Sequence, residues 1–231
     1  MTNIEKNIEN IRDKIEVSAV KAGKRAEDIT LIAVTKTRTP EEINEAIKLG
    51  IADIGENKVQ EILDKYEKIE PVRWHMIGHL QTNKVKYIID NVSLIHSVDS
   101  LKLAREIDKR SGQHNKKMDI LIQINAADEK SKFGISADEA RGIIMEILES
   151  CPNIFIKGLM SIVPYAEDPE TVRKYFKEVN NIYEECKTIN HPKVEFQYLS
   201  MGMSNDYPIA IEEGANAVRI GTSIFGERKY K

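Results

Sequence analysis

The chain has 231 residues, of which 41% are hydrophobic and 31% are charged, and its formal net charge is -3 at pH 7. This composition is typical of a globular protein with a sizeable core, and the near balance of charges argues against electrostatic binding of nucleic acid or membranes. Cys151 and Cys186 lie far apart without metal-ligand spacing, and no run resembles a signal peptide or a membrane span, so we expect a cytoplasmic protein with free thiols and no metal.

The chain begins with a helical pattern. Apolar residues recur at helical spacing from Ile4 to Val17, which predicts a helix over about residues 4–22 that ends at Gly23. A short apolar run, residues 30–35, then predicts a strand that stops at Lys36. Pro40 begins the next helical pattern, which closes at Gly50.

From there, strand and helix alternate to the end of the chain. Ser100 is expected to cap the helix after the fourth strand, and Ser136 with Glu139 predicts a capping box before the next helix. The expected strands are 30–35, 52–55, 74–78, 94–98, 118–125, 154–162, 196–201 and 217–220. Helices are expected over about 56–66, 83–89, 136–150 and 204–214, and two more are expected to begin near residues 100 and 168.

About eight strand–helix repeats in a row predict an α/β fold, a single (β/α)8 TIM barrel with an extra N-terminal helix. The barrel should fill residues 1–231 as one domain, because such barrels take about 250 residues. An open doubly wound sheet is the alternative, but no Gly-x-Gly-x-x-Gly follows the first strand.

The active end of such a barrel is the carboxyl edge of its strands. A lysine at that edge can condense with a carbonyl when burial lowers its pKa, although a solvated strand-end lysine is the simpler interpretation of Lys36 alone. The polar and small residues expected at this edge are Lys36, Asn57, His79, Asp99, Asn125, Ser161, Ser200, Met201, Gly202, Arg219, Gly221 and Thr222.

The last two strand ends predict a phosphate site. Gly202 and Gly221 let the backbone approach an anion, and Ser200, Ser204 and Thr222 offer hydroxyl donors. Because the first and last strands become neighbours when the barrel closes, a phosphorylated aldehyde would satisfy both the lysine and the anion site.

Arg219 precedes the second of these loops. A guanidinium facing a pyridine nitrogen would keep that nitrogen unprotonated and make the ring a weak electron sink. An outward, salt-bridged arginine is the alternative.

Several motifs together resemble the pyridoxal phosphate homeostasis protein family, and the likeness covers nearly the whole chain. They are Ala33–Lys36, Gly55–Asn57, Trp74–Lys84, Lys130–Gly134, Gly158–Met160, Leu199–Ser204 and Val218–Gly226. The resemblance implies the barrel of the alanine racemase N-terminal domain and pyridoxal 5'-phosphate (PLP) held as an internal aldimine on Lys36. It also implies that Ser200, Gly221 and Thr222 hold the phosphate, that Arg219 faces the ring nitrogen and that Asn57 lines the ring. Met201, Gly202 and His79 complete the expected cofactor-binding set.

The resemblance further implies intracellular PLP homeostasis and delivery without substrate turnover, with PLP-dependent apoenzymes as candidate recipients. Because the partner-supplied domain of the racemases is lacking, we expect a monomer. A PLP-dependent amino-acid racemase of low activity is the alternative, with Tyr165, Tyr207 or His79 as its second base. A cofactor-free Schiff-base aldolase that uses Lys36 is a third hypothesis. We expect both tyrosines at the rim.

Two further features are interpreted structurally. His75 and His96 lie within apolar strands, and we expect them to be core residues. Residues 128–132 are expected to form a loop, with a lid or a second cofactor contact through Lys130 or Lys132 as the alternative.

Overall fold

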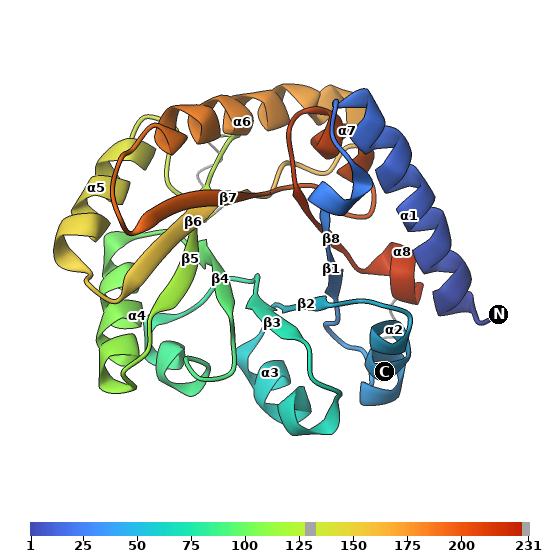
Figure 1. Ribbon diagram of the computed structural model, residues 1–231, viewed down its shortest axis with the longest axis horizontal. Helices are drawn as coiled ribbons and strands as arrows, with labels where there is room; N and C mark the ends of the chain where they lie inside the picture. Colours follow the sequence, from blue (N-terminus) through green and yellow to red (C-terminus); the bar gives the residue numbers. More distant parts are fainter. Residues whose placement is uncertain (128–132, 228–231) are drawn as a thin grey trace.

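Eight parallel strands form a closed barrel in a computed structural model, which describes residues 1–127 and 133–227. The strand order around the barrel is the order in the sequence, and the register Thr30↔Ala217 to Ala33↔Ile220 joins the first strand to the last (Figure 1). The strands are β1 Thr30–Val34, β2 Asp53–Glu56, β3 Arg73–Met76, β4 Leu94–Val98, β5 Met118–Ile124, β6 Ile154–Ser161, β7 Val194–Ser200 and β8 Ala217–Ile220. The predicted barrel is therefore confirmed, and the open sheet is excluded.

Helices surround the barrel on the outside (Figure 1). The α-helices are α1 Asn3–Lys21, α2 Pro40–Lys48, α3 Val59–Lys65, α4 Leu101–Gln113, α5 Ala140–Ser150, α6 Arg173–Lys187, α7 Tyr207–Glu212 and α8 Thr222–Phe225. Short 3-10 helices are η1 Ala26–Asp28, η2 Tyr66–Lys68, η3 Thr82–Tyr87 and η4 Pro169–Val172. The extra helix α1 packs against α7 and α8, as expected of an addition before the first strand.

Local sequence explains where α2 begins. The hydroxyl of Thr39 accepts a hydrogen bond from the backbone N–H of Glu42, and the Glu42 carboxylate accepts one from the backbone N–H of Thr39. Pro40 occupies the first turn, where no backbone donor is needed. This capping box fixes the helix that follows the Lys36 turn.

Some expected element boundaries were wrong. The segment after β3 forms the 3-10 helix η3 rather than an α-helix. Helix α5 begins at Ala140, because the Ser136 hydroxyl donates to the Glu139 carboxylate instead of capping a backbone N–H. Val17, placed on the buried face by its spacing, is exposed on α1.

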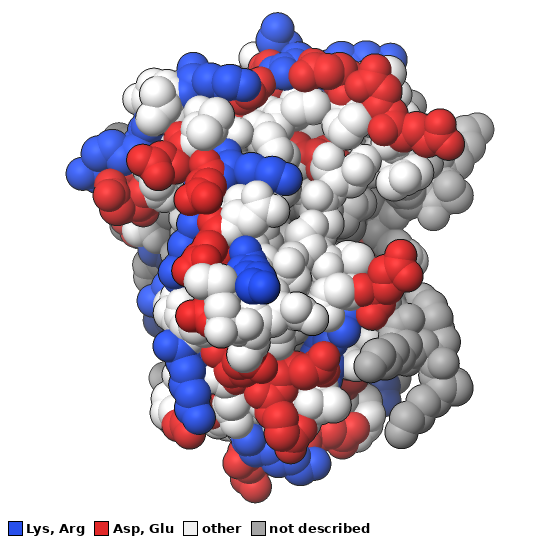
Figure 2. Space-filling model, turned by 90° about the vertical axis from the view of Figure 1, so that its right-hand side faces the viewer, with Lys and Arg blue, Asp and Glu red and all other residues white. Residues whose placement is uncertain are grey.

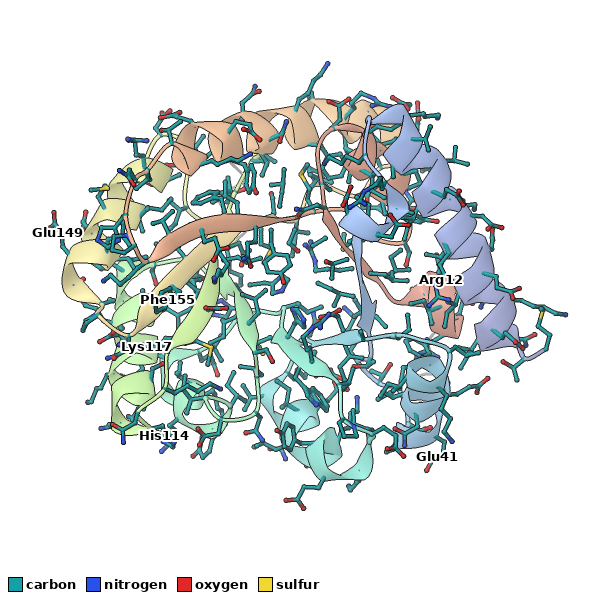
Figure 3. All side chains as sticks on the ribbon, viewed as in Figure 1. Arg12, Glu41, His114, Lys117, Glu149 and Phe155 are labelled. Atoms are coloured by element: carbon teal, nitrogen blue, oxygen red, sulfur yellow. The ribbon has the colours of Figure 1, made fainter. Side chains whose placement is uncertain are left out.

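Side chains fill both the barrel and the shell around it (Figure 3). The labelled side chains of Glu41, His114 and Glu149 lie at the periphery and extend outward. The main apolar core lies between strands and helices, and a second, smaller cluster inside the barrel contains Leu94, Leu121, Met160 and Tyr198. The rest of the barrel interior contains polar side chains, described below.

The surface shows charges of both signs. On the face drawn in Figure 2, acidic and basic side chains are interspersed. Within residues 1–127 and 133–227, no helix has the length and apolar character needed to cross a membrane.

Candidate functional site: the mouth of the barrel

The turn after β1 carries Lys36 at the carboxyl edge of the strands, which we call the mouth of the barrel. The backbone N–H of Thr35 still donates to the Gly55 carbonyl at 3.1 Å, and the chain then turns at Lys36. Thr37 adopts a φ of 64°, a strained conformation for a β-branched residue. Its backbone N–H donates to the Glu61 carboxylate at 2.7 Å, which helps hold this conformation.

A buried ion cluster anchors this turn from below. Lys65 Nζ lies 2.8 Å from Glu56 Oε1, 2.8 Å from Glu61 Oε2 and 2.9 Å from the Thr35 carbonyl oxygen. The Thr35 hydroxyl also donates to Glu56 Oε1 at 2.7 Å. Burial raises the pKa of Glu56 in spite of the nearby Lys65 ammonium. The residue before Lys36 is thus fixed through both its backbone and its side chain.

A cavity of 310 Å³ opens where β1, β7 and β8 end. Three of its lining residues are cationic, and its described lining contains no carboxylate. The lining residues are Val34, Lys36, Arg38, Tyr165, Met203, Ser204, Asn205, Arg219, Gly221 and Thr222. This set of charges and hydroxyls favours an anionic ligand.

Arg219 is the most enclosed cation of this cavity, with 3% of its surface exposed. Its Nη1 donates to the Ser200 hydroxyl at 2.6 Å, and its Nη2 donates to the Ser161 carbonyl oxygen at 2.8 Å. Burial lowers the pKa of Arg219 to about 10, with the negative charge of Asp206 acting in the opposite direction. The guanidinium is therefore still charged at neutral pH, and the expectation of an outward arginine is excluded.

Two glycines shape the backbone here. A Cβ on Gly221 would lie 3.2 Å from Val34 Cβ, so a side chain would crowd the junction of β8 and β1. Gly202 has a φ of 93°, and its Cβ would lie 2.6 Å from Ala210 Cβ. Gly202 therefore permits the close approach of α7, and it does not line the cavity.

The expected site residues divide into three groups. Lys36, Arg219, Gly221 and Thr222 line the same cavity, as the sequence predicted. Ser200 and Met201 are fully buried beside it, and the Ser200 hydroxyl contacts Arg219 and His96. Asn57 and His79 lie elsewhere. The cofactor contacts that were predicted for these residues remain predictions.

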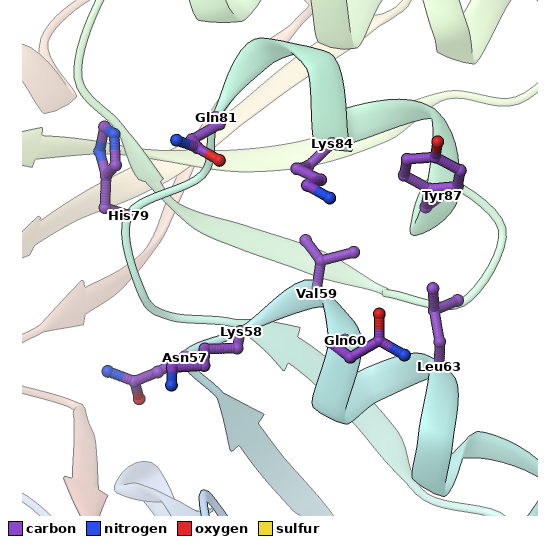
Figure 4. A pocket seen from close by; sticks show the side chains of 9 residues that line it. All are labelled: Asn57, Lys58, Val59, Gln60, Leu63, His79, Gln81, Lys84 and Tyr87. Atoms are coloured by element: carbon purple, nitrogen blue, oxygen red, sulfur yellow. The ribbon is translucent and has the colours of Figure 1, made fainter.

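Asn57 and His79 line a neighbouring groove of 510 Å³ (Figure 4). His79, Gln81, Lys84 and Tyr87 form one side of this groove, and the segment from Asn57 to Leu63 forms the other. His79 Nδ1 lies 3.2 Å from Asp99 Oδ2, and its ring stacks on Phe133 with the centroids 3.7 Å apart. Asn57 Oδ1 is buried without a hydrogen-bond partner in the described structure.

The two candidate tyrosines differ. Tyr165 lies at the rim of the cavity with 81% of its surface exposed, as expected. Tyr207 was expected at the rim as well, and this was wrong, because it is buried beneath Gly202 on α7. Burial raises the pKa of Tyr207 to about 12.

Sequence reasoning missed two contributors to the site. Arg38 lines the cavity and donates to the carbonyl oxygens of Phe225 and Gly226, which ties the Lys36 turn to the end of α8. Lys65 was not singled out, because nothing in a helical pattern shows that a lysine reaches back to a strand end. The loop at residues 128–132, including Lys130 and Lys132, lies outside the described residues.

Comparison with known proteins identifies the family. The model of the family "Alanine racemase, N-terminal domain" matches residues 2–229. A pyridoxal phosphate homeostasis protein of Aquifex aeolicus is 43% identical over 225 residues, which cover 96% of this chain and 97% of the relative. The chain belongs to the pyridoxal phosphate homeostasis protein family. A member from Escherichia coli is 36% identical over 237 residues and matches the whole of this chain.

Solved structures agree with this family. PipY of Synechococcus elongatus, solved with PLP bound, has a TM-score of 0.82 and 28% identity, and the match covers 96% of this chain and all of PipY. An alanine racemase of Clostridium difficile has a TM-score of 0.73 at 16% identity, and the match covers 58% of that chain. The racemase shows only that the barrel is shared, whereas the homeostasis family shares the full length.

Proposed function

We propose that this protein binds PLP at the mouth of the barrel and acts in vitamin B6 homeostasis, holding and delivering the cofactor without substrate turnover. The observation that carries the proposal is that Lys36, Arg219 and the Gly221–Thr222 turn line one cavity with no described carboxylate. The names of the relatives and the PLP bound to PipY support the same ligand.

The residues present fit this cofactor. When bound, PLP supplies an aldehyde that condenses with a primary amine with loss of water. Lys36 would provide the amine, and the hydroxyls of Ser204 and Thr222 would hold the phosphate. Ser200, expected to share this role, has its hydroxyl engaged by Arg219 and His96, so we assign the phosphate contact to Ser204 instead.

Arg219 would face the ring nitrogen of the bound cofactor. A guanidinium does not give its proton to a pyridine at neutral pH, so the ring nitrogen would stay unprotonated and the ring would withdraw electrons weakly. This would favour holding the cofactor over using it.

The placement of the candidate second bases supports a carrier rather than a racemase. A racemase needs acid and base groups on both faces of the substrate carbon. Tyr165 extends into solvent, Tyr207 is buried in the core, and His79 pairs with Asp99 in the neighbouring groove. Only Tyr165 lines the same cavity as Lys36, and it does so from the solvent-exposed rim. We further propose a monomer in the cytoplasm, with residues 1–231 as one domain and PLP-dependent apoenzymes as recipients.

A comparison of PLP with pyridoxal, which lacks the phosphate, tests the site. Thr222→Ala should weaken PLP binding about tenfold or more, because one hydrogen bond to a charged group is lost, and should leave pyridoxal binding unchanged. Thr188→Ala, at the exposed carboxyl end of α6 and away from the mouth, is the control. Equal weakening of PLP and pyridoxal binding would show that the phosphate does not bind at this turn. A protein that stays colourless with PLP would favour the cofactor-free aldolase.

Loss of α-deuterium from amino acids separates the carrier from the racemase. The PLP-loaded protein should show no catalytic exchange with L- or D-amino acids. Turnover that depends on Lys36 would favour the racemase alternative.

A further inference from the structure

Five buried polar side chains cross the interior of the barrel in one hydrogen-bonded line, which we call the polar line. It runs from Asp53 on β2 through His75, His96 and Ser200 to Arg219 on β8. The successive distances are 2.9 Å from Asp53 Oδ1 to His75 Nε2, 2.9 Å from His75 Nδ1 to His96 Nε2, 3.1 Å from His96 Nδ1 to Ser200 Oγ and 2.6 Å from Ser200 Oγ to Arg219 Nη1. It begins at the amino end of the strands and ends at the cavity.

The two ends together set the direction of the bonds. Arg219 can only donate and an ionised Asp53 can only accept, so the line runs one way, with the Ser200 hydroxyl accepting from Arg219 and giving its own hydrogen to His96 Nδ1. His96 therefore carries its proton on Nε2 and donates to His75 Nδ1. His75 in turn carries its proton on Nε2 and donates to Asp53. Each imidazole then has one nitrogen that donates and one that accepts.

The carboxylate end requires the same direction. Arg73 Nε and Nη2 donate to the two oxygens of Asp53, each at 2.6 Å. Burial alone would raise the pKa of Asp53, but the hydrogen bonds from His75 and Arg73 outweigh it and keep the pKa below its ordinary value. An ionised Asp53 can only accept, and this fixes the direction of the line up to Ser200. Burial also keeps the pKa of His96 well below its ordinary value.

One of the two described side-chain hydrogen bonds of Arg219 goes to the polar line. Within residues 1–127 and 133–227, Arg219 makes no ion pair, and its side-chain hydrogen bonds go to Ser200 and the Ser161 carbonyl. While its own hydrogen points to His96, the Ser200 hydroxyl keeps its acceptor positions for Arg219, whereas in a reversed line His96 would donate to the same oxygen and compete for them. The orientation of the guanidinium is thus tied, bond by bond, to Asp53 at the other end of the barrel.

We propose that Asp53, His75, His96 and Ser200 are positioning residues that hold the Arg219 guanidinium against the ring nitrogen of bound PLP, with Asp53 setting the direction of the whole line. The cofactor half of this inference rests on the proposed function, whereas the direction of the line is a property of the protein alone.

Asp53→Asn tests the direction. Arg73 Nη2 keeps the amide oxygen in the place of Oδ2, and the amide NH2 takes the place of Oδ1. There it displaces Nε of the exposed Arg73 and donates to His75, which reverses the line. His75 and His96 then carry their protons on Nδ1, and the Ser200 hydroxyl accepts hydrogen bonds from both His96 and Arg219. Asp119→Asn is the matched control, because Asp119 is a half-buried carboxylate at the amino end of β5 and no described contact joins it to the line.

The readout is the nitrogen chemical shifts of the histidine side chains in cofactor-free protein at pH 7. We expect the Nε2–H tautomer for both His75 and His96 in the unmodified protein and in Asp119→Asn, and the Nδ1–H tautomer for both in Asp53→Asn. An Nδ1–H tautomer in the unmodified protein would overturn the inference, even if the variant failed to fold. Unchanged tautomers in folded Asp53→Asn would overturn it as well.

The visible absorption band and the release rate of PLP test the link to the cofactor. Asp53→Asn and Ser200→Ala should both shift the band and speed release about fivefold, the equivalent of one hydrogen bond of about 1 kcal/mol, while Asp119→Asn should change neither. Reversed tautomers with an unchanged band and release rate would refute the positioning role. A protein that failed to bind PLP would refute the proposed function and leave the tautomer result standing.

Discussion

Replacing Lys65 by methionine removes the ammonium that anchors the Lys36 turn, and keeps the apolar stem. In the unmodified protein, Lys65 Nζ contacts Glu56, Glu61 and the Thr35 carbonyl oxygen, all at 2.8 to 2.9 Å. Glu56 is fully buried, and its Oε2 has no partner in the described structure. Without Lys65, the only described hydrogen bond to the Glu56 carboxylate comes from the Thr35 hydroxyl.

Removing one partner of a buried ion pair costs about 3–5 kcal/mol of unfolding free energy. That is a large part of the 5–15 kcal/mol by which folded domains are stable, in order of magnitude. At roughly 2–4 °C per kcal/mol for a chain of this size, the melting temperature should fall by about 6–20 °C. An exposed lysine nearby, Lys68, provides the control, and Lys68→Met should change stability by less than about 0.5 kcal/mol.

The loss should depend on pH. The pKa of Glu56 is already raised by burial and rises further when Lys65 is removed. A raised pKa in the folded state contributes stability that is present below the unfolded pKa and lost as pH rises through the folded pKa. Lys65→Met should therefore lose more stability at pH 8 than at pH 5, measured by urea unfolding. Glu56→Gln in the same background should recover most of the loss at pH 8. A loss below about 1 kcal/mol, or no recovery, would refute this reasoning.

The remaining predictions concern the site and the core. Arg219→Glu should protonate the ring nitrogen of bound PLP and raise α-proton exchange with amino acids, and an unchanged exchange rate with PLP still bound would show that Arg219 does not face that nitrogen. Gly202→Ala should cost about 2–4 kcal/mol because its Cβ would clash with α7 at a φ of 93°, whereas Gly142→Ala, with open space around it, should gain about 0.5–1 kcal/mol; equal urea midpoints for the two variants would contradict this. Cys186, buried and with its pKa raised to about 11, should react with a thiol reagent only after unfolding, and rapid labelling of the folded protein would contradict its burial.

The barrel could be predicted because its repeats are regular. Each strand is a short apolar run that stops at a polar residue, and the next helical pattern begins within a few residues. The same regularity placed Lys36, Arg219, Gly221 and Thr222 at one edge, because the ends of parallel strands share an edge and closure joins β1 to β8. Boundaries were less certain where a 3-10 turn replaced a helix, as in η3.

The interior of the barrel could not be predicted in the same way. The strands are covered on both faces, so apolar residues do not alternate cleanly and the inward face is not visible in the sequence. His75 and His96 were correctly expected to be buried, but their partners depend on strand register. Buried polar groups require partners, so two histidines on neighbouring apolar strands were the available signal for the polar line.

Reduction of the PLP-treated protein with borohydride, followed by digestion and mass spectrometry, tests most directly whether the cofactor attaches to Lys36. The adduct should appear on the peptide that contains Lys36 and on no other, and Lys36→Ala should abolish both the adduct and the yellow colour. An adduct on another lysine, or none after PLP treatment, would contradict attachment at the mouth of the barrel.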